Sequence, residues 1–304
     1  MGQKAKPKAT VFGATAIWLE AARPRTLPAA AAPVLIGSVM AAADDAFAWA
    51  AAVLALLGAL SIQIGTNLHN DHADHARGAD TADRVGPRRV AQAGLLEPEE
   101  LRRGIAVVFA AAGVIGMIAA IVGGWPILVV LAASVAAALA YTGGPRPLGY
   151  LGFGDVMAFV FFGPVAVAAT YFLHAGAWPV EAIVAGAGPG LLAAAILTVN
   201  NLRDIETDRA AGKRTLAVRF GAGFARAEYL GCIVGAAVVP TVLAIATGRW
   251  AGALPLMTLI AAMPWVLIVL RPDSRPPDLN HALAGTARAM LIHALLFSIG
   301  WSIA

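Results

Sequence analysis

Long apolar runs are the feature of this sequence that most restricts its fold. A helix that crosses the hydrocarbon core of a bilayer needs about 20 mostly apolar residues, with a working range of about 17–25. Nine stretches qualify: Leu27–Ala43, Phe47–Thr66, Gly104–Val122, Trp125–Thr142, Gly154–Leu173, Val180–Val199, Ala227–Thr247, Trp250–Leu270 and Ala287–Ala304. Charged residues make up only 13% of the 304 residues, well below the roughly 25% of soluble domains. The sequence therefore predicts an all-α, multi-pass bundle of nine transmembrane helices.

The basic residues indicate how this bundle lies in the membrane. Suppose that the N-terminus is cytoplasmic and that the spans alternate. All of the 22 lysines and arginines except Arg249 then lie on the cytoplasmic side. This positive-inside bias favours an odd number of spans. We expect a cell-membrane protein with its C-terminus outside. No cleavable signal peptide is predicted, because no short apolar segment with a cleavage site follows the basic N-terminus. The basic excess reflects topology, and the sequence has no soluble basic module for nucleic acid.

The loop lengths suggest a division of the chain. We expect a cytoplasmic N-terminal segment, residues 1–25, followed by a membrane domain, residues 26–304. Two long polar loops on the cytoplasmic side each follow the second helix of a four-helix set. This pattern indicates two similar halves plus a ninth helix, with one central cavity between the halves that opens to the cytoplasm.

Each long loop begins with a stripe of amide and acidic residues. Positions three or four apart share one face of a helix. The stripes are Asn67, Asp71 and Asp74 in the first motif, and Asn200, Asp204 and Asp208 in the second. Carboxylates at membrane depth are expensive and are candidate functional residues. The alternative is that these acids only end helices and pair with nearby arginines, but two motifs after corresponding helices favour a shared role.

Divalent cations would relieve the repulsion among carboxylates that converge on one cavity. Mg²⁺ is held by one or two carboxylates, with substrate phosphates completing its shell. Nearby basic side chains would stabilise the charge that grows on a diphosphate as its carbon–oxygen bond breaks. The candidates in the cytoplasmic loops are Arg77, Arg146, Lys213 and Arg214. For Arg102, Arg103, Arg271 and Arg275, a lipid-headgroup contact or a topology signal is the better explanation.

Three histidines around the first motif invite a zinc interpretation, which we reject. His69, His72 and His75 recur every three residues, so they drift around a helix. The neighbouring oxygen ligands suit a hard cation better than zinc.

The motifs and their surroundings resemble the UbiA superfamily of intramembrane prenyltransferases, most closely its 1,4-dihydroxy-2-naphthoate polyprenyltransferase branch. The matching stretches are Ala22–Pro28, Asn70–Arg88, Tyr141–Leu148, Gly152–Asp155, Phe162–Pro164 and Asn200–Leu216. The second acidic motif, with the Gly-Lys-Arg-Thr-Leu that ends at Leu216, is the most specific of them. Nine spans fit the nine-helix bundle of the family. The three histidines depart from its pattern, in which aromatic or small residues are more usual.

The resemblance implies an activity and its substrates. A polyprenyl diphosphate would ionise, and the carbocation would be attacked by 1,4-dihydroxy-2-naphthoate with loss of the ring carboxylate, giving demethylmenaquinone for menaquinone biosynthesis. The isoprenoid tail would lie among the apolar helices or exit into the lipid bilayer.

The resemblance also implies a role for each site residue. One Mg²⁺ would bind Asp71 and Asp74, and another Asp204 and Asp208. The side chains that orient ligands or substrate would be Asn67, Asn70, Asn200 and Asn201. The side chains that hold the diphosphate would be Arg23, Arg77, Arg146 and Lys213. Asp155 would contact the aromatic acceptor, anchor Arg146 or form a buried salt bridge.

Two alternative functions stay open at this point. One is a sister prenyltransferase for another acceptor, such as 4-hydroxybenzoate or homogentisate. The other is a membrane transporter, although a transporter places its site near the midplane with access from both sides. The sequence does not fix the prenyl length, the oligomeric state or the roles of His69, His72 and Asp80.

Overall fold

The protein folds as a bundle of helices. The computed structural model describes residues 11–78, 86 and 88–303, and the regular structure within them is entirely helical. The helices are α1 (Val11–Ala22), η1 (Pro24–Thr26), α2 (Pro28–Ala43), α3 (Trp49–Ala76), α4 (Pro98–Gly123), α5 (Pro126–Thr142), α6 (Gly154–Phe162), α7 (Pro164–Ala175), α8 (Val180–Ala185), α9 (Ala187–Arg203), α10 (Ile205–Ala210), α11 (Leu216–Ala246), η2 (Trp250–Met257), α12 (Thr258–Leu270) and α13 (Pro276–Ser302). The prediction of an all-α fold is confirmed.

Most of these helices are suited to a membrane. Seven helical stretches in the described part of the chain are long and apolar enough to cross a bilayer, or eight if the pair formed by Gly13–Thr26 and Pro28–Ala43 is one bent span. The helix Pro126–Thr142 is also apolar but shorter. Large apolar side chains such as Ile121 and Ile260 are exposed on the outside of the bundle, as expected where lipid replaces water. The protein is therefore a multi-pass membrane protein.

Local sequence signals explain where the helices begin and end. Proline is the first residue of several helices, where its missing N–H costs nothing because that group has no partner within the helix. At α4, Glu100 accepts a hydrogen bond from the backbone N–H of Glu97 at 2.7 Å, as part of a capping box. Gly176 ends α7 in the left-handed conformation, which a residue without Cβ adopts at little cost.

Several helices are longer than the apolar runs that predicted them. The chain remains helical in α3 to Ala76, and α13 begins at Pro276 instead of Ala287. The mean hydropathy of a sequence window falls as soon as polar residues enter it, whereas the backbone hydrogen bonds of the helix continue through those residues. The polar turns missed in this way carry the first acidic motif in α3 and Asn280 in α13.

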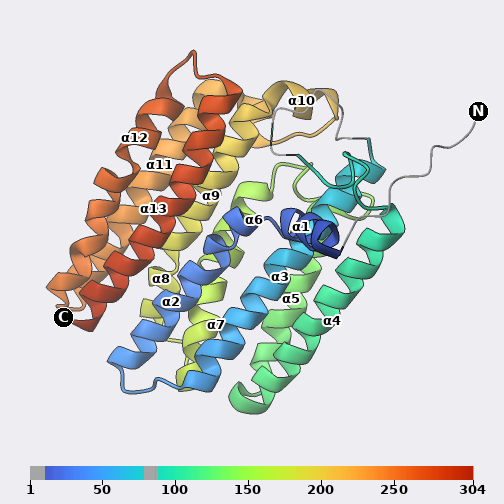
Figure 1. The fold of residues 1–304 in the computed structure, drawn as a ribbon. Coiled ribbons are helices and arrows are strands. Elements are labelled where there is room, and N and C mark those ends of the chain that lie inside the picture. Colours follow the sequence, from blue (N-terminus) through green and yellow to red (C-terminus); the bar gives the residue numbers. More distant parts are fainter. Residues whose placement is uncertain (1–10, 79–85, 87, 304) are drawn as a thin grey trace, which may run out of the picture.

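Apart from α1 and α10, the helices run roughly parallel to one another (Figure 1). In that view α11, α12 and α13 form one edge, α3, α4 and α5 form the other, and α2, α6, α7 and α9 lie between them. Helix α9 packs against α6, α11 and α13, and α13 also packs against α2. The short helix α10 lies at the same end as α1, and the C-terminus lies at the opposite end.

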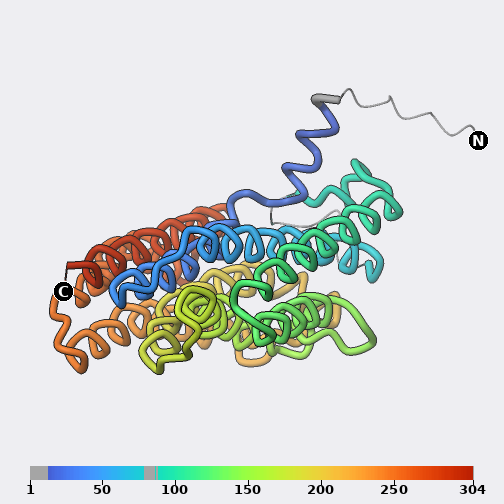
Figure 2. Tube along the Cα trace, turned by 90° about the horizontal axis from the view of Figure 1, so that it is seen from below, coloured from blue at the N-terminus to red at the C-terminus, as the bar shows by residue number. Residues whose placement is uncertain are grey.

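The N-terminal segment contains a helix that the sequence analysis did not predict. Helix α1 leaves the bundle at an angle (Figure 2), and the bend between it and α2 is 53°. Its second half packs through Ile17, Trp18 and Ala21 into a cluster with Leu68 of α3 and Leu101 of α4. This half of α1 is therefore part of the folded domain.

Two broken spans meet through glycine. Helices α6 and α7 are separated at Gly163, and α8 and α9 at Gly186. A Cβ on Gly163 would lie 2.5 Å from the carbonyl oxygen of Gly186 and 2.7 Å from Cα of Gly190. Backbones that approach this closely exclude any side chain, and small residues serve this purpose at helix contacts in membranes.

We predict that Gly190→Ala destabilises the bundle. The new Cβ would lie 2.4 Å from the carbonyl oxygen of Phe159, and overpacking against backbone costs about 1–3 kcal/mol. Gly231→Ala, at an exposed position of α11, is the control, because no heavy atom lies within 4 Å of its Cβ. The free energy of unfolding in mixed detergent micelles should fall only for the Gly190 variant. An equal effect of both substitutions would contradict the close contact.

Candidate functional site

A cavity of about 450 Å³ lies inside the bundle. It is polar at one end and apolar at the other. Its charged and amide side chains are those of Arg23, Arg25, Gln63, Asn67, Asn70, Asp74, Arg89, Asn200, Asn201, Asp204, Asp208 and Lys213. Its apolar arm is lined by side chains of α3, α4, α5 and α7, among them Leu54, Ile115, Ile127, Leu131, Val165 and Leu173. The cavity is therefore shaped for a molecule with an anionic head and a long apolar tail.

Asp74 is the acid of the first motif that faces this cavity. Its side chain is 3% exposed and lies 2.9 Å from the Arg89 guanidinium. The Tyr150 hydroxyl donates to Oδ1 of Asp74 at 2.8 Å, and the Lys213 ammonium lies 3.7 Å from Oδ2. A carboxylate buried this deeply requires such compensation.

Asp71, about one turn earlier on α3, has a different partner. Its Oδ2 accepts a hydrogen bond from the backbone N–H of Val90 at 3.0 Å, and it does not line the cavity. Arg89 donates to the carbonyl oxygen of Asn70 at 3.0 Å. Together these bonds fasten the turn around residue 90 to α3, which delivers Arg89 to Asp74.

The second motif is organised by Arg203. This side chain is 1% exposed and donates to both oxygens of Asp204, at 2.7 and 2.5 Å. It also donates to Oδ1 of Asn200 and to Oδ1 of Asn280, each at 2.7 Å. Arg203 thus neutralises Asp204 and ties the end of α9 to the first turns of α13.

Lys213 joins the two motifs. Its Nζ lies 3.4 Å from Oδ1 of Asp208 and 3.7 Å from Oδ2 of Asp74. Burial raises the pKa of Asp208, and the neighbouring Lys213 acts in the opposite direction. The acidic stripes of α3 and of the α9–α10 region therefore meet at one place, as the sequence analysis predicted.

The amide side chains occupy both motifs. Asn67 donates to the carbonyl oxygen of Ala22 and to Oγ1 of Thr26, each at 3.0 Å, which docks the segment before α2 onto α3. Asn70 accepts a hydrogen bond from the Thr142 hydroxyl at 2.7 Å. Asn200 and Asn201 line the cavity, and Asn201 is buried.

Only some of the side chains predicted to hold the diphosphate line the cavity. Arg23 and Lys213 line the cavity, and Arg23 has left-handed backbone angles of φ 53° and ψ 67°. Such strain in a non-glycine residue is concentrated at functional positions. Arg77 donates to the carbonyl oxygens of Thr142 and Gly144. Arg146 and Arg214 are exposed, and none of these last three lines the cavity.

Arg89, Tyr150 and Arg203 are site residues that the sequence analysis did not single out. Arg89 is one of several arginines in a basic loop, and nothing in its spacing shows that it turns back to α3. Tyr150 comes shortly after the Tyr141–Leu148 stretch, and this proximity in the sequence is the signal that could have identified it. The Tyr150 ring lies under the Lys213 ammonium at 5.0 Å and the Arg77 guanidinium at 5.5 Å. Asp80 and Arg84 lie outside the described residues.

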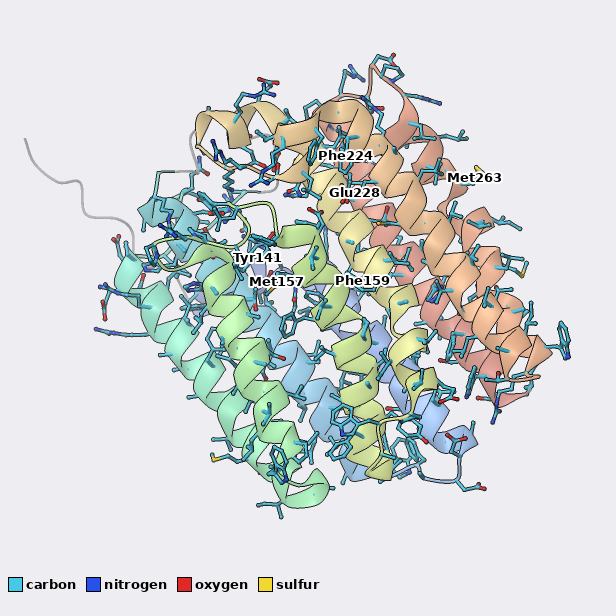
Figure 3. The ribbon with its side chains drawn as sticks, turned by 180° about the vertical axis from the view of Figure 1, so that it is seen from behind. Tyr141, Met157, Phe159, Phe224, Glu228 and Met263 are labelled. Carbon is cyan, nitrogen blue, oxygen red and sulfur yellow. The ribbon has the colours of Figure 1, made fainter. Side chains whose placement is uncertain are left out.

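Asp155 does not reach the cavity. The Thr198 hydroxyl of α9 donates to its Oδ1 at 3.4 Å, and Arg146 is exposed elsewhere. Met157, which follows on α6, does line the cavity, as does Tyr141 of α5. Figure 3 shows these two residues near each other, with Glu228 apart from them on α11.

The donor set at the polar end consists of carboxylate and amide oxygens, which suit a hard divalent cation. Among the described residues, no group of three or more His, Cys, Asp and Glu side chains is arranged as a metal site. Arg89, Arg203 and Lys213 instead pair with the carboxylates of Asp74, Asp204 and Asp208. The chemistry of the site fits Mg²⁺, and its present charge balance is supplied by basic side chains.

Comparisons with known proteins show what the chain as a whole is similar to. Residues 30–296 match the model of the UbiA prenyltransferase family. A 1,4-dihydroxy-2-naphthoate octaprenyltransferase of Haemophilus influenzae is 36% identical over 296 residues, covering 93% of this chain and 95% of the relative. The enzyme with the same description from Mycobacterium tuberculosis is 40% identical over 281 residues, covering 91% and 94%. A UbiA homologue from Archaeoglobus fulgidus, solved bound to GPP and Mg²⁺, shares the fold with a TM-score of 0.64 at 16% identity, covering 93% of this chain and 99% of that one.

We predict that Arg203→Met strongly destabilises the protein. Removing one partner of a buried ion pair leaves an uncompensated charge and costs about 3–5 kcal/mol. Arg209→Met is the matched control, because Arg209 pairs with Glu206 on an exposed surface, and such pairs contribute about 0–1 kcal/mol. The free energy of unfolding in mixed micelles measures both. Equal losses would show that Arg203 has no special role.

Proposed function

Since the chain belongs to the UbiA prenyltransferase family, we propose that it transfers a polyprenyl group from polyprenyl diphosphate to 1,4-dihydroxy-2-naphthoate. The product, after loss of the ring carboxylate, has the demethylmenaquinone skeleton. The observation that carries this proposal is the meeting of both acidic motifs around Lys213, at the polar end of a cavity with a long apolar arm. The relatives from H. influenzae and M. tuberculosis support the acceptor.

The enzyme works within the cell membrane. Taking α2, which is the second part of the bent pair, and the shorter α5 as spans in addition to the seven longer stretches gives nine. With alternating spans, the N-terminus and the motif loops are cytoplasmic and the C-terminus is outside, in line with the positive-inside bias. The polar end of the cavity then opens toward the cytoplasm, where a diphosphate is available. Residues 1–25 form the N-terminal segment and residues 26–304 the membrane domain.

The donor lies along the cavity with its diphosphate at the polar end. Arg23 and Lys213 contact the diphosphate from the cavity wall, while Arg77 and Arg146 approach from the rim. Arg fits phosphate oxygens through its planar fork of donors, and Lys acts as a point charge. The isoprenoid tail occupies the apolar arm between α3, α4, α5 and α7, whose side chains keep water away from the allylic carbon.

The carboxylates are the proposed magnesium ligands. Asp71 and Asp74 hold one ion, and Asp204 and Asp208 hold another, with amide oxygens from Asn67, Asn70, Asn200 and Asn201 orienting ligands or substrate. When bound, Mg²⁺ neutralises the diphosphate and makes it a better leaving group. The A. fulgidus homologue, which was solved with GPP and Mg²⁺, supports the use of a divalent ion.

The chain's own residues then serve three tasks in the reaction. The basic side chains stabilise the charge on the diphosphate as the allylic carbon–oxygen bond breaks. The cavity holds the electron-rich naphthalene ring beside the allylic carbon, so that a carbon–carbon bond forms at the carboxylated ring position. The ring carboxylate leaves as carbon dioxide, and its electron pair restores the aromatic ring.

The transfer is tested with purified protein, one polyprenyl diphosphate and a panel of aromatic acceptors, with products identified by mass. We expect the decarboxylated prenylated naphthalenediol as the main product, and no such product with 4-hydroxybenzoate or homogentisate. Asp208→Asn should reduce turnover by at least about a hundredfold, since one lost charge-stabilising group typically costs that much, while folding is retained. Substrate flux across proteoliposomes without any prenylated product would instead support a transporter.

A further inference from the structure

The ammonium of Lys213 lies beside carboxylates of both acidic motifs. It lies 3.4 Å from a carboxylate oxygen of Asp208 and 3.7 Å from one of Asp74. The two acids belong to different motifs, on segments that are far apart in the chain. The ammonium therefore supplies positive charge to both halves of the site at once.

The contacts of Lys213 are looser than those of the other basic side chains. Arg89 lies 2.9 Å from Asp74 and donates to the carbonyl oxygen of Asn70 as well. Arg203 makes four hydrogen bonds of 2.5–2.7 Å. Lys213 has a flexible stem, and its side chain is 16% exposed, against 9% for that of Arg89. Of these three cations, Lys213 is the one that can move without dismantling a hydrogen-bond network.

Tyr150 links the lysine to the acid. Its ring lies 5.0 Å from Nζ of Lys213, and its hydroxyl donates to Oδ1 of Asp74 at 2.8 Å. A cation over an aromatic face is attracted by the ring quadrupole, by about 0.5–2 kcal/mol depending on desolvation. The backbone N–H of Lys213 also donates to the carbonyl oxygen of Asp208 at 2.8 Å. The backbone hydrogen bond thus fixes the point from which the side chain starts, and the Tyr150 ring contacts the ammonium at its other end.

We propose that Lys213 is an exchangeable counter-ion. It neutralises Asp74 and Asp208 in the metal-free enzyme, and it releases them to a divalent cation while Tyr150 keeps its ammonium at the mouth of the site for the diphosphate. This inference rests on the proposed function and adds to it. Metal and lysine compete for the same two carboxylates. When metal and diphosphate are both bound, the ammonium is more stable beside the diphosphate than beside the carboxylates.

The competition has a counter-intuitive consequence for metal binding. Removing a positive charge from beside two acids should make the metal-free site more attractive to a divalent cation, even though the same change harms diphosphate binding. An effect on the order of tenfold is expected for a like charge at this distance in a partly solvated site. If the lysine served only to hold the fold together, its removal would weaken the binding of the divalent cation.

The test uses Mn²⁺ alone, whose binding to the purified full chain is measured by electron paramagnetic resonance. Lys213→Met and Lys213→Gln should bind Mn²⁺ about tenfold more tightly than the unaltered protein, and Lys213→Arg should bind it with unchanged affinity. Arg209→Met, which removes an equal charge from the exposed surface of α10, is the control and should have no effect. Thermal unfolding of each variant confirms that it is folded.

A second measurement adds inorganic pyrophosphate in the presence of Mn²⁺. Both neutral Lys213 variants and Tyr150→Leu should bind pyrophosphate at least about tenfold more weakly. Tyr150→Phe, which keeps the ring under the ammonium, should lose less. This contrast separates a positioning role of the ring from a general loss of structure.

The outcomes separate this inference from the proposed function. Neutral Lys213 variants that bind Mn²⁺ no more tightly than the unaltered protein would overturn the exchange while leaving a metal-dependent transferase intact. A protein that binds no Mn²⁺ under any condition would overturn both.

Discussion

The structure depends on how buried carboxylates of two distant segments are neutralised at the edge of a membrane bundle. Asp74 and Asp208 approach a common lysine, and Asp204 is held by a guanidinium that is almost wholly buried. Carboxylates without such partners would repel one another and would pay a large desolvation cost. The basic partners therefore determine how closely the two motifs can approach, and the approach defines the polar end of the cavity.

The remainder of the bundle serves to bring these segments together. The glycine contact between Gly163 and Gly190 lets the α6–α7 span press against α9, which carries Arg203 and Asn200 at its end. Arg203 reaches Asn280 and so fastens α13 to the same place. On the other side, the turn after α3 returns Arg89 to Asp74. Rigid apolar helices thus carry a small polar centre, while the space left between α3, α4, α5 and α7 becomes the apolar arm.

The sequence predicted the fold class and both acidic motifs because apolar length and helical spacing are local properties. It could not identify Arg89 or Tyr150, whose contacts with Asp74 cross loops: the Tyr150 bond spans 76 positions of the chain. Nor could spacing separate Asp74, which faces the cavity, from Asp71, which holds the turn at Val90. The start of α13 was set too late because hydropathy ends where its polar turns begin. Helix α1 was missed because the basic residues before it read as a cytoplasmic tail.

The most direct measurement is a structure of the protein with Mn²⁺ and a non-cleavable thio analogue of a polyprenyl diphosphate. Anomalous scattering should place one manganese at the first acidic motif, beside Asp74, and another at the second, beside Asp208, with the diphosphate beside Arg23 and Lys213 and the isoprenoid tail in the apolar arm. Manganese bound away from both acidic motifs, or a diphosphate seated outside the cavity, would contradict the view that the two motifs form one catalytic centre.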